Sequence, residues 1–176
     1  MNENTPPQSH SSWSMADVSA KPVSYRLAVA AGRITLGGEA MALLAGGQLP
    51  KGDPLAMAEV AGIMAAKQTP NLLPLCHPIA LNRVAVRHIL RPAVHAVDML
   101  CLAEISARTG VEMEALTGLN IALLTVWDLV KPINPALAIT DIRLLFKSGG
   151  KSGDWTHPDG IAPEFASLIR EFRGPV

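Results

Sequence analysis

Apolar and polar positions follow a helical period most clearly over residues 109–132, the longest such stretch in the chain. Gly110 stands near its start, and Pro132, which cannot continue a helix, stands at its end. Apolar residues occupy almost every face, which predicts a buried helix. One stripe at steps of three and four nevertheless carries charge at both ends; it consists of Glu114, Thr117, Ile121, Leu124, Asp128 and Lys131.

The two charged ends of this stripe need partners, a solvent-filled cleft or a ligand, because burying an unpaired ion is costly. Glu114 and Asp128 are separated by roughly 21 Å along a helix, so one helix cannot bring both to one small substrate. Two copies packed antiparallel about a twofold axis could. The pattern therefore favours a homo-oligomer with sites between subunits. The alternative is ordinary end-of-helix charges, with acids first and lysine last, as the macrodipole favours.

The remaining pattern predicts four strands, at 23–36, 81–90, 94–107 and 139–146, with a short hairpin at 91–93. A short helix is expected at 39–44. A longer one is expected at 54–67, where Asp53 is a natural N-cap and Pro54 suits the first helical position. This order is the βαββαβ pattern of a ferredoxin-like α+β sandwich, with one antiparallel sheet and helices on one face. The open sheet face again favours oligomers.

Composition points to one compact domain with a sizeable core. The chain has 176 residues, of which 49% are hydrophobic and 17% are charged, with no net charge. Residues 1–14 are expected to form a disordered tail, 15–154 the domain, and 155–176 a C-terminal tail with room for a short helix at 163–172. Residues 69–78 are expected to form a turn-rich loop with three prolines, and 147–154 a glycine-rich loop.

Several classes of partner are disfavoured. A neutral charge balance gives no electrostatic footprint for nucleic acid or an anionic membrane. No apolar run approaches the ~20 residues that a membrane span needs, and the N-terminus lacks the apolar segment of a secretory signal. Two cysteines are too few for a disulfide framework, which suits a reducing cytosol. We therefore expect a cytoplasmic protein.

Cys76 and His77 lie side by side between prolines. The pair suggests zinc, but no second pair of ligands stands at the usual spacing, so we expect no metal held by the protein's own ligands. A histidine in a rigid loop is better suited to phosphate binding or proton transfer. The alternative is a loop histidine bonded to backbone.

Lysines in turns form a second candidate group. Lys147 and Lys151 lie in KSGGKSGD, which lacks the first glycine of a Walker A loop but can still approach an anion through backbone N–H groups. The alternative is a flexible basic turn. Lys51 precedes a helix N-terminus, where a lysine can bind anions or act as an acid or base, although most turn lysines are simply solvated.

Six motifs in this order resemble the MoaC family: MADVSAK, KGD, AGIMAAKQTPNLLPLCHP, TGVEMEALTG, WDLVK and LLFKSGGKSGD. The likeness runs from about residue 15 to residue 154. It implies a ferredoxin-like domain assembled into a hexamer, a trimer of dimers, with active sites at subunit interfaces.

The resemblance also implies an activity, that of cyclic pyranopterin monophosphate synthase in molybdenum cofactor biosynthesis. That lyase rearranges 3′,8-cyclo-7,8-dihydroguanosine triphosphate, made from GTP by a radical S-adenosylmethionine partner, and releases pyrophosphate. No redox change occurs, so no redox cofactor is expected, although the triphosphate can carry Mg²⁺.

Residues carried over from the family by motif define the expected site. Asp128, Lys51 and Lys131 match its catalytic aspartate and essential lysines. Substrate contacts are expected from Leu75, Cys76, His77, Met113 and Glu114, and from Lys147 on the triphosphate. To these we add Glu112, Lys151, Arg26 and Lys67, although composition alone marks the last two as ordinary.

The chain differs from the family motif at one position, and two other functions are alternatives to the synthase. The family usually has lysine where this chain has Arg108, which keeps the charge but cannot transfer a proton. A non-catalytic, nucleotide-binding paralogue acting as an oligomeric scaffold is one alternative reading. A metal-dependent phosphohydrolase is another, but the chain lacks a carboxylate cluster at metal-ligand spacing.

Overall fold

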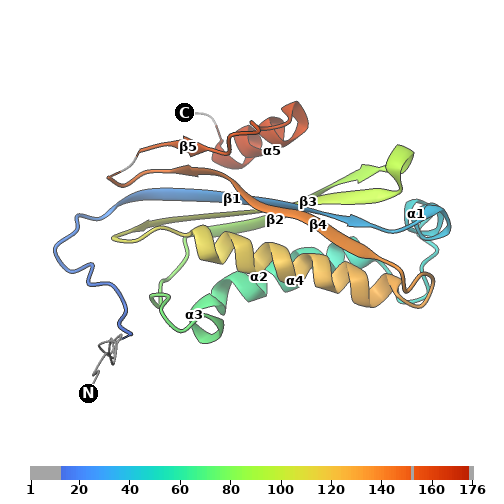
Figure 1. Cartoon of the computed structure of the whole chain (residues 1–176), viewed down its shortest axis with the longest axis horizontal. Helices are drawn as coiled ribbons and strands as arrows, with labels where there is room; N and C mark the ends of the chain where they lie inside the picture. Colours follow the sequence, from blue (N-terminus) through green and yellow to red (C-terminus); the bar gives the residue numbers. More distant parts are fainter. Residues whose placement is uncertain (1–12, 152, 175–176) are drawn as a thin grey trace, which may run out of the picture.

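The computed structural model describes residues 13–151 and 153–174, so most of the expected N-terminal tail lies outside the described residues. Its centre is an antiparallel sheet in the order β2-β3-β1-β4-β5 (Figure 1). The strands are β1 (Ser24–Thr35), β2 (Arg83–Arg91), β3 (Ala96–Ala107), β4 (Ala138–Ser148) and β5 (Trp155–Thr156). The order of the first four strands confirms the predicted ferredoxin-like α+β arrangement.

Helices α2 (Pro54–Lys67) and α4 (Glu112–Val130) cover one face of the sheet, and α1 (Gly38–Ala45) lies at one end of it (Figure 1). Helix α2 begins as its sequence predicts. The Asp53 carboxylate accepts hydrogen bonds from the backbone N–H groups of Leu55 at 2.9 Å and Ala56 at 3.2 Å, while Pro54 needs no such partner. This cap fixes the start of α2 and with it the preceding turn, which carries Lys51.

Helix α4 is the predicted long helix, slightly shorter at both ends than its pattern. By length and composition alone it could cross a membrane. Its buried side chains instead pack against the sheet and α2, as those of a core helix do; they include Ala115, Leu119, Ala122, Leu123 and Val126.

Helices α2 and α4 cross with their backbones almost in contact. A Cβ atom added at Gly118 would lie 2.9 Å from the carbonyl oxygen of Gly62 and 2.7 Å from the Sγ of Cys101 on β3. A Cβ atom added at Gly62 would lie 2.8 Å from the carbonyl oxygen of Gly118. Real Cβ atoms do not approach other atoms so closely, so both helices require glycine at the crossing.

Two connections differ from the sequence prediction. Residues 69–72, expected as loop, form the short helix α3 (Thr69–Leu72), because Pro70 suits a first helical turn and Thr69 donates its hydroxyl to the carbonyl of Ala66 at 3.0 Å. The hairpin between β2 and β3 is a 3₁₀ turn (Pro92–Val94) closed by His95 with a positive φ of 50°, so β3 begins two residues later than predicted.

The C-terminal part adds two elements. Strand β4 extends through Lys147, which was expected in the glycine-rich loop, and β5 pairs Trp155 with it. Helix α5 (Pro163–Arg173) forms where a short helix was predicted and lies on the sheet face opposite α2 and α4 (Figure 1). The helices of the βαββαβ unit thus share one face, and α5 covers part of the other.

Helix α5 is held by apolar and polar contacts. Phe165, Ile169 and Phe172 are buried against apolar residues of the sheet, which include Leu27, Leu100 and Leu102. The Arg83 guanidinium lies 4.0 Å from the centre of the Phe172 ring and donates a hydrogen bond to the Phe172 carbonyl. Helix α5 therefore covers part of the sheet face that was expected to be open.

The close crossing of α2 and α4 can be tested with Gly118→Ala, because helix propensity and packing predict opposite changes in the free energy of unfolding. Replacing glycine by alanine inside a helix raises helix propensity by about 1 kcal/mol, so propensity alone predicts that Gly118→Ala stabilises the protein. Overpacking costs about 1–3 kcal/mol, and one of the atoms met here is backbone. We expect a net loss in the free energy of unfolding, measured by urea denaturation.

Glu171→Ala, at an exposed position on helix α5, is the control; it should stay within about 0.5 kcal/mol of the original protein. A Gly118→Ala variant as stable as the original would mean that the two helices are not in backbone contact.

Candidate functional site

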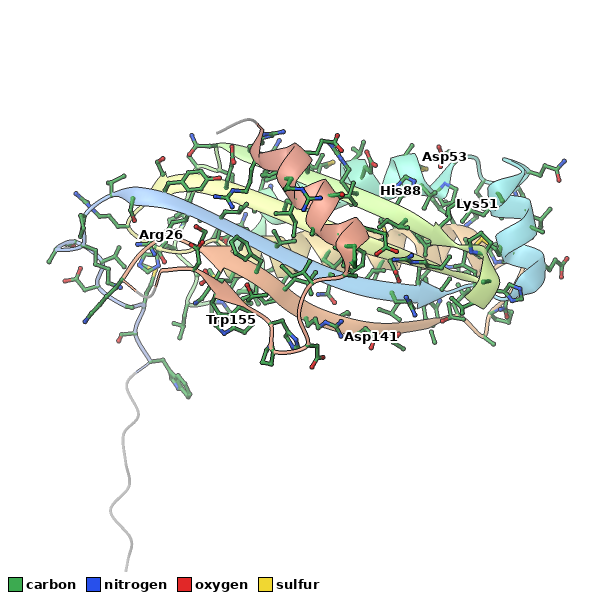
Figure 2. All side chains as sticks on the ribbon, turned by 90° about the horizontal axis from the view of Figure 1, so that it is seen from above. Arg26, Lys51, Asp53, His88, Asp141 and Trp155 are labelled. Carbon is green, nitrogen blue, oxygen red and sulfur yellow. The ribbon has the colours of Figure 1, made fainter. Side chains whose placement is uncertain are left out.

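The predicted site residues fall into two groups at opposite ends of α4. Lys51, Asp128 and Lys131 meet at its C-terminal end, and the residues of the proline-rich loop meet its N-terminal end. Figure 2 shows this separation, with Arg26 and Lys51 at opposite ends of the molecule. The spacing of roughly 21 Å between Glu114 and Asp128, expected from the helical rise, is therefore kept in the folded chain.

At the C-terminal end, Asp128 lies between two lysines. Its Oδ1 is 2.6 Å from the Nζ of Lys131, and its Oδ2 is 3.8 Å from the Nζ of Lys51. Lys51 also lies 3.5 Å from the Asp128 carbonyl oxygen. Residues far apart in sequence thus form one cluster, because the Asp53 cap places the turn before α2 beside the end of α4.

The two lysines keep Asp128 ionised. The hydrogen bond from Lys131, then the charges of Lys131 and Lys51, lower the pKa of the Asp128 carboxyl below its ordinary value. More than half of the Asp128 side chain is exposed. The cluster is therefore an accessible carboxylate with two ammonium groups beside it, which can supply protons and bind an anionic ligand.

The second group lines a pocket of about 250 Å³ at the N-terminal end of α4. The loop after α3, the residues before α4 and the first turn of α4 form its walls. It gathers six predicted residues, Leu75, Cys76, His77, Glu112, Met113 and Glu114, together with Ala16, Ile79, Thr109 and Gly110.

His77 is fixed in this pocket by a contact to the N-terminal segment. Its Nε2 lies 2.8 Å from the carbonyl oxygen of Ala16. This is the backbone-bonded histidine considered as an alternative, yet the ring also lines the pocket. Within the described residues, no three His, Cys, Asp or Glu side chains lie close enough together to hold a metal ion.

Burial raises the pKa values of both Glu114 and Cys76. Glu114 is only 3% exposed, and this burial raises the pKa of its carboxyl; the charge of Glu112 raises it further, against a backbone hydrogen bond that lowers it. Burial and then the charge of Glu114 raise the pKa of the Cys76 thiol. The pocket thus disfavours added negative charge at these groups, and a hydrogen-bonding or cationic part of a ligand would relieve Glu114.

Two further cations approach this end of α4. Lys147 on β4 lies 3.1 Å from Glu112. Arg26 on β1 lies against the glycine loop: a Cβ atom at Gly150 would collide with its guanidinium, and one at Gly149 would collide with the carbonyl of Tyr25. Both glycines have positive φ, so this loop can follow the Arg26 side chain only because it carries no side chains of its own there.

Two predicted residues are not joined to either group by contacts of their own. Lys67 is exposed in the last turn of α2, and Lys151 is exposed in the turn after Gly150. Neither forms an ion pair within the part of the chain that the structure describes.

The pocket continues into two adjoining hollows. One, of about 590 Å³, shares Leu75, Cys76 and Met113 and adds the apolar Trp13, Leu73 and Pro74. The other, of about 550 Å³, shares His77, Ile79 and Thr109 and also contains Arg108. The position where this chain departs from the family motif is therefore beside the pocket.

Several residues that line this pocket were not predicted from the sequence. Ile79 and Thr109 were not singled out, although they directly follow the Cys-His loop and directly precede the long helix. Adjacency to two motifs that meet in space was the available signal, and it becomes visible only once the two segments are known to touch.

Comparison with known proteins identifies the family of this chain. Three relatives named cyclic pyranopterin monophosphate synthase align along most of their length. One from a Nocardioides species is 49% identical over 145 residues, covering 82% of this chain and 89% of its own. One from Chloroflexus aurantiacus is 48% identical, covering 82% and 88%. One from Streptomyces griseus subsp. griseus is 51% identical, covering 83% and 82%.

The family model described as the MoaC family matches residues 15–150. That range contains every predicted site residue except Lys151, and it ends before β5 and α5. With more than half of the chain matched and relatives at this level of identity, the chain belongs to the MoaC family.

Proposed function

We propose that this protein is a cyclic pyranopterin monophosphate synthase, which converts 3′,8-cyclo-7,8-dihydroguanosine 5′-triphosphate to cyclic pyranopterin monophosphate and releases pyrophosphate in molybdenum cofactor biosynthesis. Its family and the names of its relatives support this activity. The observation that carries the proposal is the Lys51–Asp128–Lys131 cluster, where an accessible carboxylate lies within 3.8 Å of two lysines.

The reaction needs proton transfers and neutralisation of phosphate charge. Opening one ring, closing another and attacking a phosphate each require a proton to move at a defined atom. Lys51 and Lys131 would donate or accept these protons and stabilise the leaving pyrophosphate. Asp128, held at 2.6 Å by Lys131, would orient the lysines or remove a proton.

The pocket at the start of α4 would bind the rest of the substrate. Glu114 suits the guanine-derived amino groups, because an amino donor compensates a buried carboxylate. His77, Lys147 and Arg26 would hold the triphosphate, with Lys151 and Lys67 adding positive charge. Leu75, Cys76, Met113 and Glu112 would form the wall. No step needs a redox cofactor, and Mg²⁺ would enter only with the triphosphate.

A complete site needs two chains, so we propose a homo-oligomer, a hexamer built as a trimer of dimers. Apolar side chains exposed on the outer helical face support this arrangement. On α2, Met57, Val60 and Met64 recur at helical spacing and are each more than half exposed, as is Leu124 on α4. Covering this stripe with a second copy in antiparallel orientation would bring Glu114 of one chain towards Asp128 of the other.

The proposed setting is the cytoplasm, where a radical S-adenosylmethionine enzyme that cyclises GTP would supply the substrate. Two free cysteines, one of them fully buried, are compatible with a reducing compartment.

The first test is turnover of the cyclised dihydro-GTP intermediate, followed through pyrophosphate and the pyranopterin product. Lys51→Ala should reduce turnover by about 100- to 10,000-fold, the usual contribution of a positioned acid or base. Arg170→Ala, at an exposed position on α5, should keep the full rate. A normal rate for Lys51→Ala would remove its assigned role, and tight binding without product by the unaltered protein would identify a non-catalytic paralogue.

The shared site predicts complementation between inactive variants. Lys51→Ala and His77→Ala change opposite ends of α4, so each mixed dimer would keep one intact site. Half of the dimers in an equal, reassembled mixture are mixed, so the mixture should recover about a quarter of the original activity.

The matched control is a mixture of Lys51→Ala and Lys131→Ala, which change the same end and leave every site defective. Equal activity in the two mixtures would refute a site shared between chains.

A further inference from the structure

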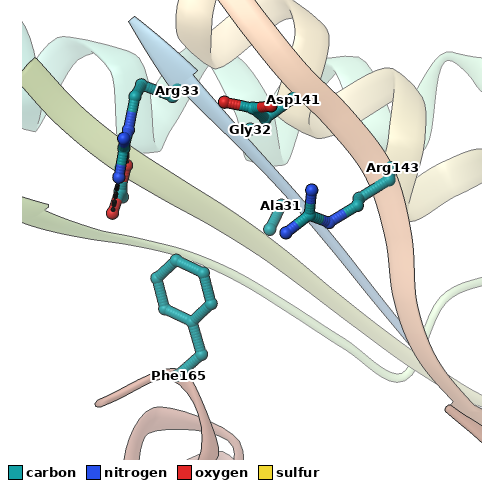
Figure 3. A pocket seen from close by; sticks show the side chains of 7 residues that line it. Ala31, Gly32, Arg33, Asp141, Arg143 and Phe165 are labelled. Carbon is teal, nitrogen blue, oxygen red and sulfur yellow. Dashed lines mark hydrogen bonds and ion pairs between the residues drawn. The ribbon is translucent and has the colours of Figure 1, made fainter. Parts of the chain in front are cut away.

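A polar pocket of about 200 Å³ lies on the sheet face opposite the candidate site (Figure 3). Strands β1, β3 and β4 form its floor and the first turn of α5 forms one wall. It is lined by Ala31, Gly32, Arg33, Asp98, Asp141, Arg143 and Phe165. None of these residues belongs to the groups at the ends of α4.

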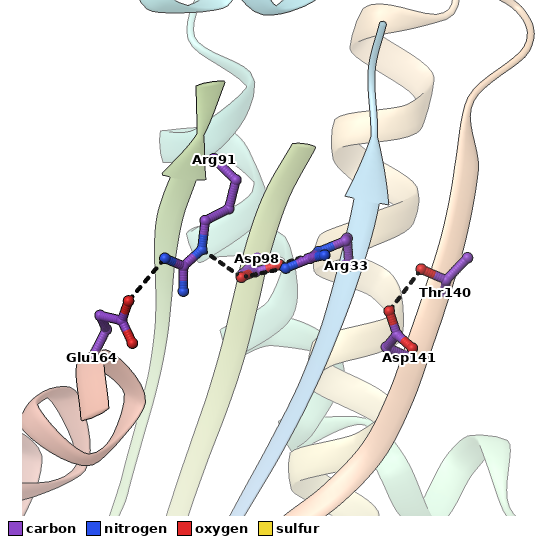
Figure 4. Close-up of polar contacts among 6 residues, drawn as sticks. All are labelled: Arg33, Arg91, Asp98, Thr140, Asp141 and Glu164. Carbon is purple, nitrogen blue, oxygen red and sulfur yellow. Dashed lines mark hydrogen bonds and ion pairs between the residues drawn. The ribbon is translucent and has the colours of Figure 1, made fainter. Parts of the chain in front are cut away.

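Two of the four charged residues that line this pocket, Arg33 and Asp98, form an ion pair with each other. The Asp98 carboxylate accepts hydrogen bonds from Arg33, at 2.5 and 3.0 Å, and from Arg91 at 2.8 Å (Figure 4). Arg91 also reaches Glu164 on α5 at 3.0 Å. Burial alone would raise the pKa of Asp98, but the two arginines outweigh it and lower the pKa. Asp98 therefore stays ionised and gives the pocket no free acceptor.

Arg143 differs from these arginines. Its guanidinium is directed over Ala31 into the pocket, opposite Phe165 (Figure 3). It forms no hydrogen bond or ion pair with the residues that the structure describes, and its Nε is buried without a partner. A buried N–H group that lacks an acceptor is costly, because it has lost water without gaining a carboxylate or carbonyl.

Asp141 leaves Arg143 unpaired because of a bulge in β4. The pairing of β1 with β4 shifts between Ala31 and Arg33, and Asp141 takes a positive φ of 57° there. A bulge re-aims side chains. The Asp141 carboxylate instead accepts a hydrogen bond from the Thr140 hydroxyl at 3.1 Å, at the exposed rim of the pocket (Figure 4).

We propose that this pocket binds a small oxyanion, a phosphate or a short carboxylate, through the guanidinium of Arg143. A guanidinium presents two parallel donors that match either group. A pocket of about 200 Å³ is large enough for either of these small ions. The backbone at Gly32 and the ring of Phe165 would exclude water around the ion pair.

The pocket depends on a segment outside the family match, which ends at residue 150. Phe165 belongs to α5, and Glu164 beside it anchors α5 to the arginine network. A bound oxyanion would therefore hold the first turn of α5 against the sheet. This inference is independent of the proposed function, since it concerns the other face and another ligand.

The test is a titration of the full chain with inorganic phosphate and, separately, with acetate at constant ionic strength. The signals followed are the Arg143 Nε–H and the backbone amide of Phe165, by nuclear magnetic resonance. We expect saturable shifts with at least one of the two anions; which anion acts tells a phosphate from a carboxylate ligand. Arg143→Gln should weaken binding at least about tenfold, and Arg170→Gln, on the exposed side of α5, should leave it unchanged.

A second variant keeps the proposal falsifiable if Arg143→Gln folds poorly. Asp141→Asn removes the negative charge at the rim while leaving Arg143 in place, so it should tighten binding severalfold. Shifts that do not saturate with either anion, or equal affinities in the original protein and Asp141→Asn, would overturn the site.

Discussion

The near-contact of α2 and α4 at Gly62 and Gly118 fixes the position of the whole candidate site. At this crossing α4 lies against the backbone of α2 and against Cys101 of β3, with no room for even a methyl group. Buried side chains along α4, from Ala115 to Val130, also pack against the sheet and α2, so both ends of this rigid helix are fixed. The loop of His77 and the turn of Lys51 therefore meet the two ends of α4 at defined places.

Much of this fold was predictable because its signals are local. The cap at Asp53 and the period of α4 depend on neighbouring residues, and the order of the elements limits the sheet to few topologies. The features that were missed depend on distant segments. Lys147 lies on a strand because Ala28 of β1 and Trp155 of β5 pair with it on either side. The short C-terminal helix gives no sign in its sequence of which sheet face it will cover.

Most of the candidate residues predicted from the sequence gather at the two ends of α4, although the environment of each was not predictable. Glu114 and Asp128 lie on the same stripe of α4, so the helical period alone predicts similar exposure for both. In the fold Glu114 is 3% exposed while more than half of the Asp128 side chain is exposed, and their pKa values shift in opposite directions. The difference comes from what lies outside the helix: the proline-rich loop covers one end, and two lysines flank the other in solvent.

The rigidity of α4 also determines how a complete site can form. Its two charged ends remain roughly 21 Å apart whatever ligand is present, so no movement within one chain can unite them. In an antiparallel pair, each α4 would give its acidic start to one site and its Asp128 end to the other. The number of sites would then equal the number of chains, and an isolated chain would contain two half-sites and no complete one. The exposed apolar residues of α2 fit this geometry, because they lie on the same layer as α4 and would be covered by the same contact.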